Sequence, residues 1–289
     1  MTPPPPRRRF LFVMSQTLRC GRFELDLRRP LVMGIVNLTR DSFSGDGLGS
    51  DTAAAIARAW RLVEKGADIL DFGGESSRPG ADSVSLQQEL DAVLPLVEAM
   101  RDCGVPLSVD TVKPEVMRAA LTAGADMIND ISALAAPGAC ETVAPTAAAV
   151  CLMHMRGEPR TMQQAPHYDD VVGEVSGFLA GRVAAAEAAG IGRERIVIDP
   201  GFGFGKTLEH NLALLRHLDG LSALGLPVLA GMSRKSMLGQ MSGRPVGERE
   251  YAGCAAGLVA VQRGARILRV HDVEAMRDTL AVWAALEGN

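Results

Sequence analysis

Short apolar runs alternate with helix-period segments along most of this chain. The apolar runs, each of which predicts a β-strand, cover residues 31–37, 68–72, 106–110, 126–131, 148–153, 195–199, 227–231 and 266–270. The first run, Leu31–Asn37, is apolar without alternation, as expected of a parallel strand that is buried on both faces. Eight strand–helix units in this order predict an α/β protein with a single (β/α)8 TIM barrel, because right-handed crossovers place every helix outside one closed sheet.

An open, doubly wound sheet is the alternative architecture for a chain of 289 residues. That fold would place a glycine-rich fingerprint directly after the first strand. The sequence at this point is Asn37-Leu-Thr-Arg-Asp-Ser-Phe43, which contains no glycine. The closed barrel is therefore the preferred prediction.

The segments between the predicted strands carry helix signals. Gly66 is expected to end the first helix, since it follows the last residue of an apolar helical face. Ser85 and Gln88 predict a capping box at the start of the second helix. Pro95 is expected to kink that helix rather than to end it, because the helical period continues on both sides.

The amino-terminal residues 1–14 contain a proline run, three arginines and only five consecutive apolar residues, which is too short a run for a secretory signal. We expect a disordered leader or a mis-assigned start, with Met14 as the initiator and residues 15–289 as one barrel domain. Deleting residues 1–13 should then leave the melting temperature unchanged. The alternating segment Arg19–Leu27 predicts a β-hairpin that covers one end of the barrel.

Composition excludes several classes of partner. The formal net charge is -4, which argues against general binding to nucleic acid or to acidic membranes. The five cysteines are scattered and form no Cys-x-x-Cys pair, so that neither disulfides nor a zinc site is suggested, and a reducing cytoplasm fits best. No apolar run approaches the length of a membrane span.

The segment Arg195–Lys206 looks like a nucleotide loop but matches neither familiar pattern. A phosphate loop ending in Gly205-Lys206-Thr207 would need a glycine where Pro200 stands, and the dinucleotide pattern would need a glycine in place of Lys206. What remains is a strand that delivers Asp199 to its carboxyl end. The glycines that follow allow close approach of the backbone to something bound there.

Polar residues stand at the carboxyl end of every predicted strand. In chain order they are Asn37, Gly73–Gly80, Asp110-Thr111, Asn129-Asp130, His154–Gly157, Asp199, Ser233–Ser236 and Arg269–His271. Singly, each has a structural interpretation, such as a turn cap for Asp199 or a satisfied core histidine for His271. Together they imply a ligand, because these ends converge on one mouth of a barrel and buried polar groups without partners are costly.

The types of side chain indicate what that ligand is. Asp110, Asn129 and Asp199 offer several acceptors and one amide, which suits a flat heterocycle with an NH/NH2 edge, such as a 2-amino-pyrimidinone. Lys235 could donate to a carbonyl on the opposite side of that ring. Arg269, His271 and Asn37 follow the last and first strands, where TIM barrels often bind phosphate, so they predict an adjacent anion site.

These residues occur in motifs that resemble the dihydropteroate synthase family of the folate pathway, over essentially all of Leu31 to Leu286. The motifs are Asn37-Leu-Thr-Arg-Asp-Ser-Phe-Ser44, Gly73-Gly-Glu-Ser-Ser-Arg-Pro-Gly80, Ser108-Val-Asp-Thr111, Ile128-Asn-Asp130, Ile198–Lys206, Ser233-Arg-Lys-Ser236 and Arg269-Val-His-Asp272, all in the family order. The resemblance implies condensation of 6-hydroxymethyl-7,8-dihydropterin diphosphate with p-aminobenzoate, which gives 7,8-dihydropteroate and diphosphate. It also implies a homodimer that forms through outer helices.

The resemblance further implies a role for each site residue. Asp110, Asn129, Met153, Asp199 and Lys235 would bind the pterin, whereas Asn37, Arg78, Arg269 and His271 would bind the diphosphate. Asn37 would also ligate Mg2+, the implied cofactor. Ser77, Pro79, Phe204 and Ser236 would form the p-aminobenzoate pocket, with the loops Thr39–Gly47 and Ser76–Gly80 closing over it. Asn37, Lys235, Arg269 and His271 would be the catalytic residues.

The implied chemistry is a dissociative displacement at the pterin methylene, because an electron-rich dihydropterin can stabilise a cation as diphosphate leaves. Magnesium, Arg269 and His271 would neutralise the charge on the leaving group, and no side-chain nucleophile is required. Three departures from the family pattern fall in the two loops: Arg40 replaces a usual proline, Gly45-Asp46-Gly47 replaces Asp-Gly-Gly, and Ser77 replaces a threonine. They affect expectations for loop closure and for inhibitor response, and leave the pterin site unaffected.

Two alternative functions share much of this site. A corrinoid-type pterin methyltransferase has a similar pocket but no use for a diphosphate site, so Ser233–Ser236 and Arg269–His271 favour the synthase. A non-catalytic paralogue would bind pterins without turnover. Release of diphosphate on addition of p-aminobenzoate would separate these cases.

Overall fold

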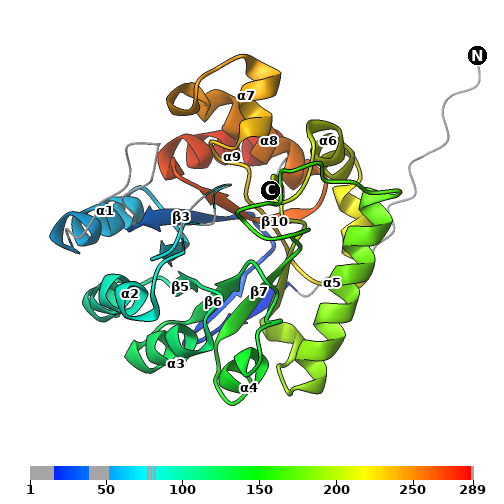
Figure 1. The fold of residues 1–289 in the computed structure, drawn as a ribbon. Helices are drawn as coiled ribbons and strands as arrows, with labels where there is room; N and C mark the ends of the chain where they lie inside the picture. The colour runs from blue at the N-terminus through cyan, green and yellow to red at the C-terminus, as the bar shows by residue number, and fades with distance from the viewer. Residues whose placement is uncertain (1–15, 39–51, 77, 79, 81–82, 288–289) are drawn as a thin grey trace, which may run out of the picture.

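The computed structural model describes residues 16–38, 52–76, 78, 80 and 83–287. Within these residues, eight parallel strands form a closed barrel in the order β10-β3-β4-β5-β6-β7-β8-β9, with helices around the outside (Figure 1). The strands are β3 (Leu31–Asn37), β4 (Ile69–Gly73), β5 (Leu107–Asp110), β6 (Met127–Asp130), β7 (Ala149–Met153), β8 (Ile196–Asp199), β9 (Val228–Ala230) and β10 (Ala265–Val270). The predicted (β/α)8 barrel is confirmed, and the ends of each predicted strand differ from the observed ends by at most one residue.

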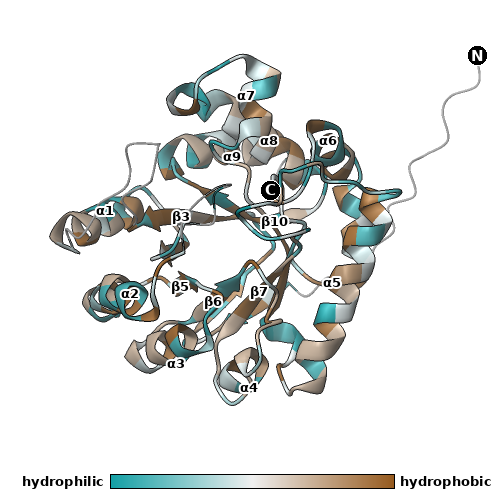
Figure 2. Ribbon diagram, in the orientation of Figure 1, coloured by the Kyte–Doolittle hydropathy of each residue, from teal (hydrophilic) through white to brown (hydrophobic). Residues whose placement is uncertain are grey.

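The helices follow the strands in the expected alternation. They are α1 (Thr52–Glu64), α2 (Leu86–Met100), α3 (Pro114–Ala123), α4 (Ala139–Val143), α5 (Val171–Ala188), α6 (Leu208–Arg216), α7 (Ser236–Ser242), α8 (Glu250–Gln262) and α9 (Val273–Glu287). In Figure 2 strand β3 is mostly apolar, whereas α5 shows both apolar and polar residues, as expected of a helix with one face on the barrel and one in water. None of the described helices has the length and apolar character needed to cross a membrane.

The capping box predicted for α2 is present. The Ser85 hydroxyl accepts a hydrogen bond from the Gln88 backbone N–H at 3.3 Å, and the Gln88 side chain accepts one from the Ser85 N–H at 3.1 Å. Each bond satisfies a donor that would lack a partner at a helix start. The helix continues through Pro95, in agreement with the helical period on both sides of that residue.

The predicted hairpin closes the amino-terminal end of the barrel. Strands β1 (Thr17–Cys20) and β2 (Phe23–Asp26) pair antiparallel. The buried side chains of Leu18 and Cys20 join an apolar cluster with side chains of the barrel strands. Gly21 at the turn has a φ of 58°, and a Cβ here would lie 2.4 Å from an oxygen of Asp126. The chain therefore needs glycine at this close approach. The proposed leader, residues 1–14, lies outside the described residues.

Candidate active site

A cavity of about 450 Å³ lies at the carboxyl ends of the barrel strands. Its lining includes most of the candidate residues: Asn37, Arg78, Asp110, Phe204, Lys235, Ser236, Arg269 and His271. Glu75, Ser76, Ser233, Arg234 and Met162, to which the sequence assigned no individual binding role, also line it. The barrel topology thus brings residues from distant parts of the chain to one mouth, as predicted.

Arg269 on β10 lines this cavity and pairs with two carboxylates. Its Nε donates to Asp71 Oδ2 at 2.6 Å, and its Nη2 donates to Asp110 Oδ2 at 2.9 Å. Burial disfavours the charge of the guanidinium, but attraction to Asp71 and Asp110 prevails and raises the pKa of Arg269 above its ordinary value. Burial raises the pKa of Asp110 to about 7, although Arg269 opposes this shift. Arg269 therefore links the two predicted sites.

Asp71 is a site residue that the sequence analysis missed. It lies inside β4 and is fully buried, and its Oδ2 accepts from Asn129 Nδ2 at 3.2 Å as well as from Arg269. Its Oδ1 has no hydrogen-bond partner among the described residues. A carboxylate inside the otherwise apolar run Ile69–Gly73 was the available signal, since a buried charge needs partners. Asp71 lies two residues before the end of β4, so a rule that selects the residues ending each strand does not select it.

The loop after β8 is held against the loop after β7. A Cβ on Gly201 would lie 1.9 Å from the carbonyl oxygen of His154, and one on Gly205 would lie 2.3 Å from that of Arg156. These glycines therefore allow the loop after β8 to approach the backbone of the loop after β7, whereas the sequence suggested an approach to a bound ligand. The Asp199 carboxylate fixes the start of the loop by accepting from the Gly201 N–H at 2.7 Å.

Lys206, which resembles the lysine of a phosphate loop, is buried and bonded within the protein. Its Nζ donates to the carbonyls of Gly201 at 2.9 Å and Phe204 at 3.0 Å, and lies 3.0 Å from His154 Nδ1. Burial lowers the pKa of Lys206 to about 7. Burial and the neighbouring Lys206 lower the pKa of His154 to about 3. Lys206 therefore organises the loop instead of facing the cavity.

Lys235 faces the cavity from the segment between β9 and α7. Its Nζ donates to the Phe202 carbonyl and lies 4.4 Å from the centre of the Phe204 ring. Burial lowers the pKa of Lys235 to about 8, and attraction to Asp199 opposes this shift. Lys235 thus lines the cavity next to Phe204 and interacts with Asp199, and it can donate a hydrogen bond to a ligand there.

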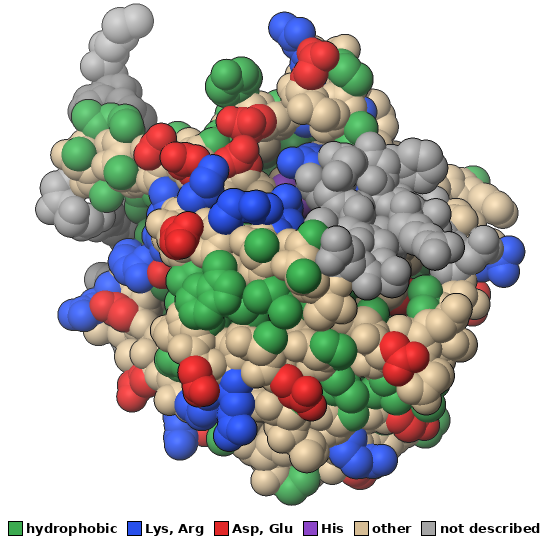
Figure 3. Space-filling model, turned by 90° about the vertical axis from the view of Figure 1, so that its left-hand side faces the viewer, with side chains coloured by type: hydrophobic (Ala, Val, Ile, Leu, Met, Phe, Trp, Pro, Cys, Tyr) green, Lys and Arg blue, Asp and Glu red, His purple; other side chains and the backbone are tan. Residues whose placement is uncertain are grey.

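Cationic side chains surround His271. Its Nδ1 lies 3.0 Å from Ser233 Oγ. Burial lowers the pKa of His271 well below its ordinary value, and nearby arginines lower it further. These are Arg234, Arg269, Arg58 and Arg78. Figure 3 shows Lys and Arg side chains gathered on the upper part of one face of the molecule. The imidazole is therefore neutral in the free protein, within a field that favours anions.

Three candidate residues lie beside the cavity without lining it. Asn129, Met153 and Asp199 are nearly completely buried. Asn129 donates to Asp71, which in turn accepts from Arg269 at the cavity wall, and Met153 belongs to an apolar cluster with Met162 and Phe204. Ser77, Pro79 and the loop Thr39–Gly47 lie outside the described residues, and so do the departures at Arg40, Gly45-Asp46-Gly47 and Ser77.

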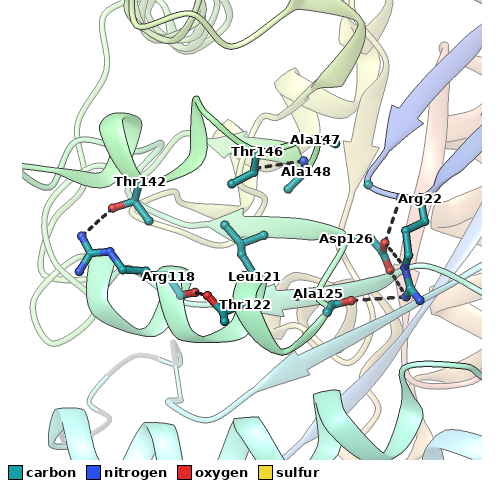
Figure 4. A pocket seen from close by; sticks show the side chains of 12 residues that line it. Arg22, Arg118, Leu121, Thr122, Ala125, Asp126, Thr142, Thr146, Ala147 and Ala148 are labelled. Carbon is teal, nitrogen blue, oxygen red and sulfur yellow. Dashed lines mark hydrogen bonds and ion pairs between the residues drawn. The ribbon is translucent and has the colours of Figure 1, made fainter.

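A second cavity, of about 360 Å³, lies at the opposite end of the barrel, near the hairpin and α3 (Figure 4). Its polar side chains bond to one another. Arg22 pairs with both oxygens of Asp126 at 3.0 Å, and Arg118 donates to the Thr142 hydroxyl at 3.3 Å. These contacts tie the hairpin to the start of β6 and α3 to α4, far from the strand ends that carry the candidate residues.

The fold and the mouth together define a class: a (β/α)8 barrel enzyme that binds a polar heterocycle beside an anion. The family model for pterin binding enzymes matches residues 33–271. The dihydropteroate synthase of Neisseria meningitidis serogroup B is 51% identical over 275 residues, which are 93% of this chain and 96% of the relative. That of Escherichia coli K12 is 49% identical over 268 residues, with coverages of 91% and 95%.

Solved structures of dihydropteroate synthases are also similar to this chain. Xanthomonas albilineans dihydropteroate synthase with 4-aminobenzoic acid has a TM-score of 0.89 at 53% identity, covering 95% of this chain and 99% of that chain. Burkholderia cenocepacia dihydropteroate synthase complexed with 7,8-dihydropteroate has a TM-score of 0.87 at 52% identity, with coverages of 95% and 98%. The chain belongs to the dihydropteroate synthase family of pterin-binding enzymes, and the resemblance inferred from the motifs is confirmed.

Proposed function

We propose that the chain condenses 6-hydroxymethyl-7,8-dihydropterin diphosphate with p-aminobenzoate to give 7,8-dihydropteroate and diphosphate. One observation carries the proposal: Arg269 pairs with Asp110 of the heterocycle site and lies in the same cavity as His271 and the surrounding arginines. A reaction that removes an anion from a heterocycle needs this adjacency, because the bond that breaks lies between the two sites. Family membership and the ligands named for related structures support the assignment.

The pterin would bind among Asp110, Asn129 and Asp199, whose oxygens accept hydrogen bonds from its NH and NH2 groups. Lys235 would donate to the ring carbonyl from the other side, and Met153 would lie against the ring. A protonated Asp110 would present a donor in place of an acceptor. We therefore expect pterin binding to favour the ionised form of Asp110.

Asn37, Arg78, Arg269 and His271 would hold the diphosphate. A neutral His271 among arginines can take up a proton when an anion arrives, because the anion offsets the charges that lower its pKa. Charge that develops on the leaving group would thus meet cations such as Arg269, whose side chain is only 19% exposed, and electrostatic stabilisation is strong in such surroundings.

The residues present fit a magnesium ion that is shared with the substrate. No group of three or more His, Cys, Asp or Glu residues that could hold a metal occurs in the described part of the chain. Magnesium commonly uses only one or two protein ligands when substrate phosphates supply the others. The amide oxygen of Asn37, which lines the cavity, would be such a ligand. When bound, the ion would neutralise charge on the diphosphate.

Phe204 and Ser236 would form the p-aminobenzoate pocket together with Ser77 and Pro79. Phe204 lies at the cavity wall beside Lys235, and Ser236 is exposed at the start of α7. The amine of p-aminobenzoate would then attack the pterin methylene as diphosphate leaves. No side chain has to form a covalent bond in this displacement.

An assay for diphosphate release tests the proposal. The protein is incubated with pterin diphosphate and magnesium, with and without p-aminobenzoate. Release that depends on p-aminobenzoate and matches dihydropteroate formed is the expected result. Binding of pterin diphosphate without release of diphosphate would instead identify a non-catalytic pterin-binding protein. A protein that binds pterins equally well with and without the diphosphate group would favour a corrinoid-type methyltransferase.

We further propose that the protein acts in the cytoplasm as a homodimer, without nucleic-acid or membrane partners. Two exposed apolar side chains on outer helices, Tyr251 on α8 and Val282 on α9, are compatible with contacts between copies of the chain. Analytical ultracentrifugation would test the dimer, and a single species with the mass of the monomer, 30.6 kDa, at micromolar concentration would refute it.

A further inference from the structure

The carboxylate of Glu75 joins the start and the end of the segment between β4 and α2 by a hydrogen bond. One of its oxygens, Oε1, accepts from the backbone N–H of Val84 at 3.2 Å. Glu75 stands at the start of this segment and Val84 at its end, so that a single carboxylate joins the two ends. Ser76 and Arg78, which line the cavity, lie between them.

The other oxygen of Glu75 connects the segment to two helices. Glu75 Oε2 forms a short ion pair with Lys113 Nζ, and Lys113 directly precedes α3. Lys113 also pairs with Glu89 Oε2 at 2.5 Å, and Glu89 belongs to α2. The Glu89 side chain is fully buried, whereas those of Glu75 and Lys113 are about a quarter exposed. Glu75, Lys113 and Glu89 therefore form a network of three charges at the edge of the cavity.

Backbone contacts restrict the segment further. A Cβ on Gly74 would lie 2.9 Å from Val93 Cγ2 and 3.0 Å from Glu89 Cγ, so the backbone here rests directly on α2. At the far side, the Gly80 N–H donates to the Pro159 carbonyl at 3.3 Å. Of the described residues of the segment, Glu75 and Val84 are thus held by charges and hydrogen bonds at its base, and Gly80 is held by the loop after β7.

The charge of Lys113 also suits the chemistry proposed for the cavity. Glu75 lines a cavity that we expect to bind diphosphate, and an uncompensated carboxylate there would repel the anion. Burial lowers the pKa of Lys113, but the hydrogen bonds that Lys113 donates to Glu75 and Glu89 prevail and raise it. Lys113 therefore stays charged over the range in which the protein works.

We propose that Glu75 and Lys113 are positioning residues, which hold Ser76 and Arg78 at the cavity wall through the network with Glu89. They act on the side of the cavity that receives the diphosphate and p-aminobenzoate, and have little effect on the pterin ring. The inference rests on the function proposed above. It adds that catalysis depends on this charge network, although two of its members, Lys113 and Glu89, do not line the cavity.

Three variants test this role. Lys113→Met removes the shared cation, Lys113→Arg preserves it, and Lys65→Met breaks a more exposed pair, that of Lys65 with Glu274, as a matched control. Lys113→Met should lower kcat/KM for p-aminobenzoate by about tenfold or more, because small misplacements of positioning groups reduce rates strongly. Its affinity for 6-hydroxymethyl-7,8-dihydropterin, which lacks the diphosphate, should change by less than about twofold. Lys113→Arg and Lys65→Met should behave like the wild type.

Amide hydrogen exchange supplies a readout that needs no activity. The Val84 amide should exchange faster in Lys113→Met and in Glu75→Ala than in the wild type, and should be unchanged in Lys65→Met. Unchanged exchange together with unchanged kcat/KM in a folded Lys113→Met protein would overturn the proposal. An equal loss of pterin binding and turnover that Lys113→Arg does not restore would overturn it as well. Wild-type protein that forms no dihydropteroate would refute the proposed function, while the Val84 exchange would still decide whether the network holds the segment.

Discussion

Arg269 Nε lies 2.6 Å from Asp71 Oδ2, although the two residues are 198 positions apart in the sequence. They stand on β10 and β4, on either side of β3 in the barrel. Asp71 also accepts from Asn129. One buried carboxylate therefore orients both an amide assigned to the pterin and a guanidinium assigned to the diphosphate.

Replacement of Asp71 by Asn should disturb both sites. It removes the charge that pairs with Arg269, and loss of one partner of a buried ion pair typically destabilises a protein by about 3–5 kcal/mol. Because repulsion from Asp71 helps to raise the pKa of Asp110, that pKa should fall below about 7 in Asp71→Asn. Carbon-13 NMR titration of the Asp110 carboxyl would measure the shift. An unchanged pKa of Asp110 would show that the two carboxylates do not interact.

Replacement of Asp199 by Asn should weaken pterin binding strongly. The carboxylate only accepts hydrogen bonds, whereas an amide would present donors to the donors of the ring, and an unmade hydrogen bond in a buried site costs about 1–3 kcal/mol. Calorimetric titration with 6-hydroxymethyl-7,8-dihydropterin would measure the loss. The same affinity in wild type and Asp199→Asn would remove Asp199 from the pterin site.

Binding of diphosphate should add a proton to His271. The pKa of this side chain lies well below its ordinary value in the free protein, so it is neutral at pH 6, and a bound anion should raise that pKa. Calorimetry at pH 6 in buffers of different ionisation enthalpy would give the number of protons taken up. His271→Gln, as the matched control, should take up fewer. Equal uptake by both proteins would contradict the predicted protonation.

The ligand-free protein should become more stable between pH 7 and about 8.5. Burial lowers the pKa of Lys206 to about 7 and that of Lys235 to about 8, so at these two lysines the unfolded chain binds more protons than the folded protein in this range. Asp110, whose pKa burial raises to about 7, contributes the opposite difference, which fades as the pH rises above 7. Stability rises with pH wherever the unfolded state binds more protons. Melting temperatures measured across this range should therefore increase, and less steeply in Lys206→Met. A slope in Lys206→Met as steep as that of the wild type would mean that Lys206 is not the titrating group.

Most of the architecture could be predicted from local patterns. The runs that became β3 to β10, the Ser85 capping box and the hairpin near Gly21 depend on periodicity and on turn chemistry over a few residues. The strand-end rule then identified Asp110, Lys235, Arg269 and His271, which line the cavity. Family motifs alone supplied the individual substrates.

By itself, the sequence determined the barrel, the family and the set of polar residues at the mouth, because strand period, strand order and motif spacing are properties of the linear chain. Only the tertiary structure decided which side chains meet. It paired Arg269 with Asp71, turned Lys206 into a buried organiser of the loop after β8, and joined Glu75 to Glu89 through Lys113. The physical reason is that these contacts join residues on different strands and loops, and the energy of a buried charge depends on partners that closure of the barrel brings together.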